Sequence, residues 1–484
     1  MALDSLAAAL ALIGIVIIVS SLLSGVIERT GVPQVAIFLL LGAVLGPAGL
    51  ALIELTLQSP TLQWIATLAL VLVLFTDAIA MDLSQINRRV LLLVLVPATL
   101  IPAVLIAAAA WLLLGLPPLL ATILGAALAS TDPVMQRNLI RRSSLPVSVR
   151  EALRLEAGIN DVVLLPIIVL SILAIGSDGG PAAAEFIRHA IGLFLLGPAL
   201  GALIGFVAIT LLERVRKRFA VRRDYESLYA LGVAFTAYAA AESVDGSGFL
   251  AAFAAGLVIA KLDVELCDCF LDYGQATAEM FLLFTFVAFG AWLIWSGFTV
   301  ADGRTLLFGL VALVMRTAVL LPVLTREGFD PRTRNIVAWI GGPRGLSSLL
   351  LILLPVFAGV PGSDRLFMIT CLVVLLSVAI HGTAIAVFLR KTEGSTGGTA
   401  PATEAPTDPA PEPRASPERI TINEMRQLKT AGEPLIIADV RTDRSYQAEV
   451  NKARGALRLP PDDAVRRARD LGLDRRATIV LYCA

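Results

Sequence analysis

Long apolar runs, separated by short polar or Gly/Pro-rich breaks, fill most of the first 391 residues of the chain. Many runs reach the ~20 residues with which an α-helix crosses the hydrocarbon core of a bilayer. We therefore expect residues 1–391 to form an all-α polytopic membrane domain with about thirteen transmembrane helices. The expected spans are 6–27, 34–54, 62–81, 90–114, 119–136, 151–175, 186–212, 226–243, 248–260, 273–296, 303–325, 335–358 and 364–389.

Positive charges in the connecting loops alternate with these spans. Nineteen lysines and arginines follow the odd-numbered spans, whereas only Arg188, Arg304 and Arg365 follow the even-numbered ones. Loops rich in Lys and Arg stay in the cytoplasm. The alternation therefore predicts an odd number of spans, with the N-terminus outside and the C-terminus in the cytoplasm. We also expect the protein to lie in the plasma (inner) membrane.

Composition excludes several classes of function. The chain is 57% hydrophobic and 16% charged, and its formal net charge is zero, so no electrostatic argument favours nucleic acid as a partner. The four cysteines form no disulfide pattern, and Cys267 and Cys269 are too few for a zinc site. We expect the lipid bilayer as surroundings, no cofactor and no enzymatic activity.

Two carboxylates and an amide interrupt the sixth expected span. Glu156 and Asn160 share one helix face, whereas Asp161 points about 140° away from Glu156. A charge inside a membrane helix costs about 2.5–3.5 kcal/mol on insertion scales, so it marks an ion or proton path by default. The alternative is an ordinary helix start, where acidic residues merely favour the helix dipole.

Other polar residues within apolar runs need partners. Arg316 lies in the middle of the eleventh expected span, and Glu156 is the obvious anionic partner, which leaves Asp161 free on its other face. Asp77, near the end of the third span, could line the ion path. For His381 in the last span, a packing or hydrogen-bonding role is favoured over a proton relay.

Two spans are interrupted at corresponding positions. The fifth contains Thr131-Asp132-Pro133, and the twelfth contains Gly341-Gly342-Pro343-Arg344-Gly345. Proline breaks helical hydrogen bonding, and matching breaks in two three-helix units are typical of inverted-repeat secondary transporters. Asp132 and Arg344 could offset the dipoles of the half-helices. The alternative is a pair of ordinary proline kinks.

The composition changes after Lys391. Residues 392–417 are rich in Pro, Thr, Ala and Gly, which is typical of a flexible linker. Residues 418–484 predict the start of a small soluble α/β domain. Its expected elements are a short helix near 423–430, strands at 434–441 and 478–484, and an amphipathic stretch at 462–471.

The polar motifs, taken in order and spacing, resemble the sodium/proton exchangers of the cation/proton antiporter-1 family over about residues 1–391. The motifs are Thr131-Asp132-Pro133-Val134, Glu156-Ala-Gly-Ile-Asn160-Asp161, Met315-Arg316-Thr-Ala-Val and Gly341-Gly-Pro-Arg344-Gly345. The resemblance implies thirteen membrane helices, a homodimer, and a division into a dimerisation domain and a mobile core domain.

The resemblance also implies roles for individual residues. Asp161 corresponds to the aspartate that binds cation and proton alternately, so it would hold Na⁺ transiently. Asn160 corresponds to its partner in a pair that accompanies electroneutral exchange. Thr131 and Asp132 match the crossing point of the broken helix.

Three further positions bear on the resemblance. Glu156 and Arg316 match a buried ion pair of the family, and Asp77 resembles, more loosely, an acidic residue that lines the ion path. Many members carry Ser directly after the matching glutamate. Here that residue is Ala157, so one cation-ligating hydroxyl is missing.

The tail is similar to the first part of a rhodanese-like domain. The resemblance rests on Ile437-Ala-Asp439-Val-Arg441, Ala453-Arg-Gly-Ala456 and Val480-Leu-Tyr-Cys483-Ala484. It implies that Cys483 would begin a loop that cradles a persulfide. That loop is absent from the sequence, and Val450-Asn-Lys452 replaces the usual Gly-His-Ile segment, so we do not expect sulfur transfer.

Together these features favour secondary active transport that exchanges Na⁺, or another monovalent cation, for H⁺ by alternating access. Three alternatives stay open. The first is a K⁺/H⁺ antiporter, and the second is a membrane-anchored sulfurtransferase or persulfide sensor that acts through the tail. The third is a cation channel regulated by the tail.

Overall fold

The chain divides into two compact units, an N-terminal unit, Met1–Thr392, and a C-terminal unit, Glu393–Ala484. A computed structural model describes residues 14–19, 22, 34–52, 56–81, 94–132, 147–176, 187–188, 190–216, 218–219, 223–262, 264–326, 331–340, 342–396, 435–441, 446, 453, 455–460, 464–473 and 478–482. Most of the predicted linker, the predicted helix near 423–430, Pro133 and Cys483 lie outside these residues.

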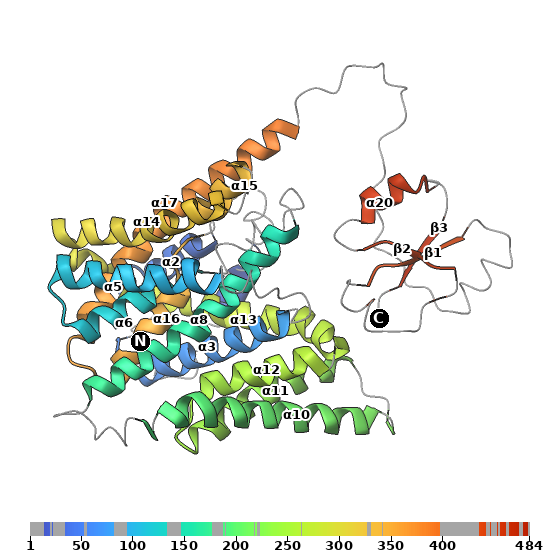
Figure 1. Ribbon diagram of the computed structural model, residues 1–484, viewed down its shortest axis with the longest axis horizontal. Helices are drawn as coiled ribbons and strands as arrows, with labels where there is room; N and C mark the ends of the chain where they lie inside the picture. The colour runs from blue at the N-terminus through green and yellow to red at the C-terminus, as the bar shows by residue number, and fades with distance from the viewer. Residues whose placement is uncertain are drawn as a thin grey trace. The chain divides into compact units, whose positions relative to one another are not determined.

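The described part of the N-terminal unit is helical (Figure 1). Its elements are α2 (Gln34–Leu45), α3 (Pro60–Ala80), η1 (Val94–Leu100), α5 (Ile101–Leu114), α6 (Pro118–Ala129), α8 (Val147–Ile175), η2 (Gly192–Leu196), α10 (Gly197–Arg216), α11 (Arg223–Glu242), α12 (Gly248–Leu262), α13 (Val264–Ala291), η3 (Leu293–Val300), α14 (Gly303–Arg326), α15 (Pro331–Asn335), η4 (Ile336–Ile340), α16 (Leu346–Phe357) and α17 (Ser363–Thr396). Among the described residues, six helices are long and apolar enough to cross a membrane, or seven if α13 and η3 form one bent span. The predicted polytopic helical architecture is confirmed, and the count of thirteen stays a prediction.

Local sequence signals set several helix ends. The Ser59 hydroxyl accepts a hydrogen bond from the Leu62 amide at 3.2 Å, and Pro60 occupies the first turn of α3. Helix α5 ends at Gly115, whose φ of 66° suits glycine. Large apolar side chains cover the outer helix faces, and Leu112 is 71% exposed. Such a surface is stable only against lipid or another apolar partner.

Helices of the N-terminal unit pack in two groups. One group contains α2, α3, α10, α11, α12 and α13, and the other contains α5, α6, α8, α14 and α16. Close approach within the first group depends on glycine: a Cβ on Gly201 of α10 would overlap the backbone of Ala251 on α12. Helices α3 and α8 meet where the two groups touch.

The C-terminal unit contains a three-stranded parallel sheet in the order β2-β1-β3, together with α20 (Ala464–Asp470). The strands are β1 (Leu435–Asp439), β2 (Leu457–Arg458) and β3 (Thr478–Tyr482). In the central strand Asp439 pairs with Arg458 on one side and Tyr482 on the other. The two predicted strands correspond to β1 and β3, whereas β2 has only two residues and was not anticipated.

Candidate ion-binding site

Two helices of the N-terminal unit stop inside the protein. Helix α6 ends at Ala129, and the chain continues as buried, non-helical backbone through Asp132. Segment η4 ends at Ile340, and residues 342–345 are non-helical before α16 begins at Leu346. Non-helical backbone at membrane depth is tolerated only where it is buried in protein or lines a cavity. These two segments are the breaks expected from the sequence.

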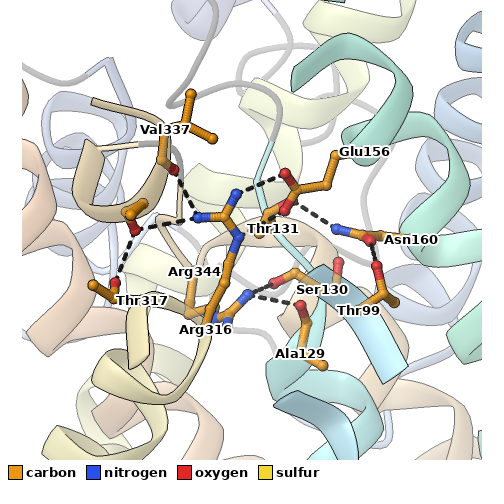
Figure 2. Close-up of polar contacts among 11 residues, drawn as sticks. Thr99, Ala129, Ser130, Thr131, Glu156, Asn160, Arg316, Thr317, Val337 and Arg344 are labelled. Carbon is orange, nitrogen blue, oxygen red and sulfur yellow. Dashed lines mark hydrogen bonds and ion pairs between the residues drawn. The ribbon is translucent and has the colours of Figure 1, made fainter. Parts of the chain in front are cut away.

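The two unwound segments are joined by hydrogen bonds. The Asp132 amide donates to the Pro343 carbonyl at 3.0 Å. The Asp132 carboxylate accepts a hydrogen bond from the Leu346 amide at 3.2 Å, at the N-terminus of α16. In return, Arg344 Nη1 donates to the carbonyls of Ala129 at 2.7 Å and Ser130 at 3.0 Å (Figure 2). Each charge therefore lies at the half-helix end whose dipole has the opposite sign.

The Glu156 carboxylate forms a bidentate ion pair with Arg316. Arg316 Nε donates to Oε1 at 2.7 Å, and Nη2 donates to Oε2 at 2.6 Å (Figure 2). The exposed fraction is 3% for Glu156 and 1% for Arg316, so neither charge is solvated. Because α8 begins at Val147, Glu156 and Asp161 lie well inside the helix. The alternative of acidic residues at a helix start is therefore wrong.

Arg316 has a second role at the end of η4. Its Nη1 donates to the carbonyls of Val337 at 3.0 Å and Ala338 at 3.3 Å, and the Thr317 hydroxyl donates to Ala338 at 2.8 Å. These carbonyls lack partners within the interrupted helix. The guanidinium thus neutralises Glu156 and satisfies the broken helix at the same time.

Asn160 and Asp161 face the other unwound segment. Asn160 Nδ2 donates to the Thr131 hydroxyl at 2.8 Å, and the Thr99 hydroxyl donates to Asn160 Oδ1 (Figure 2). The Ser130 hydroxyl donates to Asp161 Oδ1 at 2.5 Å. Asp161 is 1% exposed, so its carboxylate is enclosed by protein.

Thr99 and the serines around Asp161 were not assigned a role from the sequence. Thr99 lies in η1, a π-helical segment that contains Pro97. Irregular turns of this kind often occur at functional sites, and Pro97 was the available sequence signal. Ser130 directly precedes the motif that begins at Thr131, and Ser347 lies in the first turn of α16.

Asp77 and His381 lie on elements beside this centre. Asp77 of α3 is half-buried and packs next to Gly158 of α8, where a Cβ would lie 3.4 Å from the Asp77 Cβ. His381 Nδ1 is 3.2 Å from the Ser377 hydroxyl oxygen. The same hydroxyl accepts a hydrogen bond from the Arg344 backbone amide at 2.7 Å. His381 therefore takes part in holding the second unwound segment.

The site combines one buried carboxylate with neutral hydroxyl, amide and carbonyl oxygens. Within the described ranges, no group of three His, Cys, Asp or Glu residues is placed to hold a metal ion tightly. Crossed, interrupted helices around a buried carboxylate are the arrangement by which secondary transporters bind ions near the membrane midplane. The fold and the site together have the architecture of a secondary transporter.

Comparison with known proteins names the family. Residues 15–391 match the family described as sodium/hydrogen exchanger, transmembrane, and the chain belongs to this family. Members of the family are transporters and not enzymes.

Two relatives and one solved structure show how similar this chain is to known proteins. The K(+)/H(+) antiporter NhaP2 of Shewanella sp. (strain MR-4) is 26% identical over 380 residues, which are 76% of this chain and 64% of that protein. The Na(+)/H(+) antiporter NhaH of Halobacillus dabanensis is 27% identical over 316 residues, covering 60% of this chain and 73% of that protein. The structure of the sodium proton antiporter MjNhaP1 from Methanocaldococcus jannaschii superposes with a TM-score of 0.62 at 18% identity, covering 78% of this chain and 98% of that chain. The chain thus spans 64% of the length of the NhaP2 relative.

Proposed function

We propose that this protein is a cation/proton antiporter in which Asp161 binds a monovalent cation and a proton in turn. The observation that carries the proposal is the position of the Asp161 carboxylate, which is buried beside the crossing of two unwound segments and bonded to Ser130. Membership of the sodium/hydrogen exchanger family supports the same conclusion.

The proposed mechanism needs one shared carboxylate. A buried carboxylate is costly when it is bare, and either a proton or a cation removes that cost. The loaded protein can therefore change between inward-open and outward-open states, whereas the unloaded protein cannot. Because cation and proton compete for Asp161, movement of one is coupled to movement of the other. Asn160, held by Thr99 and Thr131, is neutral, so one cation for one proton is the expected ratio.

The names of the similar proteins point to two different cations. The Shewanella relatives are named K(+)/H(+) antiporters, whereas NhaH and MjNhaP1 are named for sodium. The motif carries Ala157 where many members of the family carry Ser, so one possible hydroxyl ligand is missing. We propose Na⁺ as the substrate, which agrees with the description of the matching family, and K⁺ as the alternative.

The proposal also covers the membrane topology, the oligomeric state and the C-terminal tail. We propose thirteen spans in inverted repeats over residues 1–391, an external N-terminus, a cytoplasmic C-terminus, a homodimer and location in the plasma membrane. The alternation of loop charges supports the orientation. Residues 392–417 would be a linker, and residues 418–484 would be the first part of a rhodanese-like domain, supported by the parallel order of β2, β1 and β3.

The proposal is tested with Asp161→Asn in everted membrane vesicles. Collapse of an imposed pH gradient is followed after addition of Na⁺, K⁺ or Li⁺. We expect the wild type to exchange, D161N to lose exchange with every cation, and the exposed control Asp364→Asn to match the wild type. An equal yield of folded D161N protein shows that the loss is functional.

The alternatives give different results. Retained exchange in D161N would refute the assignment of Asp161. A channel would show cation current without proton coupling. Cyanide-dependent thiocyanate formation from thiosulfate would instead indicate sulfur transfer by the tail.

A further inference from the structure

Two serines, one in the first unwound segment and one in the helix that follows the second, flank the Asp161 carboxylate. Ser130 follows the end of α6 and donates to Oδ1 at 2.5 Å. Ser347 lies in the first turn of α16, and its side chain lies beside the Asp161 carboxylate. The exposed fraction is 0% for Ser130 and 5% for Ser347. Both hydroxyls are therefore enclosed with the carboxylate.

The crossing of the broken helices holds both serines in place. The Ser130 carbonyl accepts hydrogen bonds from Arg344 Nη1 at 3.0 Å and from the Ser348 hydroxyl at 3.4 Å. Ser347 follows Leu346, whose amide donates to the Asp132 carboxylate. The backbone at either serine cannot move away from Asp161 without disturbing these contacts. Such preorganisation lowers the entropy cost of binding an ion.

A hydroxyl can serve either state of the carboxylate. It has one O–H donor and two acceptor lone pairs, and its hydrogen rotates freely. Towards bare Asp161, the Ser130 hydroxyl donates, and the Ser347 hydroxyl can do the same. Towards a cation held by Asp161, the same oxygens can turn their lone pairs to the ion. A hard cation that has lost part of its water shell needs several oxygen ligands, and one carboxylate supplies at most two.

We propose that Ser130 and Ser347 are cation ligands that determine specificity, so that their hydroxyl oxygens and the Asp161 carboxylate together surround a partly dehydrated alkali cation. The inference rests on the proposed function and deepens it. Ligands from both interrupted spans would also make the fit to the ion depend on how closely these spans cross. The site would then select among alkali cations by their size.

The test compares Ser130→Ala and Ser347→Ala with a matched serine on the same helix as Asp161. Ser171 of α8 is buried, and its hydroxyl donates only to the Ile167 carbonyl of its own helix at 2.8 Å, so Ser171→Ala is the control. Ser347→Thr keeps a hydroxyl at the proposed ligand position. Each variant is purified at full length and reconstituted, and the apparent KM and maximal rate are measured for Li⁺, Na⁺ and K⁺. The rise in thermal unfolding temperature caused by each cation is measured in detergent.

We expect S130A and S347A to raise the apparent KM for the preferred cation about tenfold or more and to change the order of preference among the three ions. Cation-induced thermal stabilisation should shrink in both variants, S347T should recover part of what S347A loses, and S171A should keep wild-type behaviour. Unchanged KM, order and stabilisation in S347A would overturn the inference, as would a fall in maximal rate alone. If S130A fails to fold, S347A and S347T decide the question.

Failure of the inference is distinct from failure of the proposed function. A wild-type protein that exchanges while S130A and S347A show wild-type kinetics disproves only the ligand roles. A wild-type protein that exchanges none of the three cations disproves both.

Discussion

At the scale of single residues, the centre of the N-terminal unit depends on buried charges that do more than one task. Arg316 directs Nε and Nη2 to Glu156 and Nη1 to the carbonyls at the end of η4. A guanidinium is always charged and presents five donors in a planar fork, which no lysine could reproduce. Through Arg316, the Glu156–Arg316 ion pair therefore links α8 to the interrupted helix that ends in η4.

Arg316→Ala is expected to act mainly on folding. It leaves Glu156 buried without a partner and exposes the η4 carbonyls to an empty space, at a cost of about 3–5 kcal/mol. The measurement is thermal unfolding of the detergent-solubilised protein, with the exposed Arg304→Ala as the control. A fall in unfolding temperature no larger than that of R304A would show that the pair is unimportant for stability.

At the scale of elements, each interrupted helix is completed by a side chain from the unwound segment of the other interrupted span. Arg344 satisfies the C-terminal carbonyls of α6, and Asp132 satisfies the first amide of α16. Buried helix ends without such partners would leave unsatisfied polar groups, which are costly in a membrane. Helices α6 and α16 therefore depend on each other for their own ends.

Gly345→Ala tests this mutual dependence. A Cβ on residue 345 would overlap the Asp132 carboxylate, so Asp132 must leave the N-terminus of α16. We expect a loss of roughly 1–3 kcal/mol in unfolding free energy and a large fall in the exchange rate. The control is Gly232→Ala on α11, where nothing lies within 4 Å of the added Cβ. Wild-type exchange by G345A would contradict the proposed contact.

At the scale of the whole molecule, the chain joins a helical unit to a unit built on a parallel sheet, and each has its own buried ion pair. In the C-terminal unit, Arg441 Nη2 and the Tyr482 hydroxyl both donate to Asp439 Oδ2 at 2.7 Å. Burial opposes ionisation of Asp439, but the hydrogen bonds from Arg441 and Tyr482 outweigh it and hold the pKa of Asp439 at about 2.

This pKa predicts an acid dependence of the C-terminal unit. The pKa of Asp439 lies below the ordinary value of 3.8, so ionised Asp439 stabilises the folded state above about pH 4. The stabilisation is lost as pH falls from about 4 towards 2. We expect pepsin to cleave the C-terminal unit of the full chain progressively faster over this range. Asp439→Asn should be cleaved faster at pH 4 and should show a weaker change with pH, and identical profiles for the two proteins would contradict the assignment.

The start of α8 shows a limit of sequence reasoning. The pattern placed the span at 151–175 and left open that Glu156 lay at a helix start, whereas α8 begins at Val147. Polar residues before Glu156 hid the first turns, because apolar length alone cannot show where a helix continues beyond the membrane core. The short strand β2 was missed for a similar reason, since two residues carry no periodicity.

The sequence by itself determined the helical membrane class, the two interrupted spans and the pairing of Arg316 with Glu156, because apolar length, proline and charge are local properties with large energies in a bilayer. Only the tertiary structure decided which neutral oxygens meet Asn160 and Asp161. Thr99 lies 61 residues from Asn160, and Ser130 lies 31 residues from Asp161. Hydroxyls are readily satisfied by their own helix, as Ser171 is, so they leave no sequence signal until distant segments pack together.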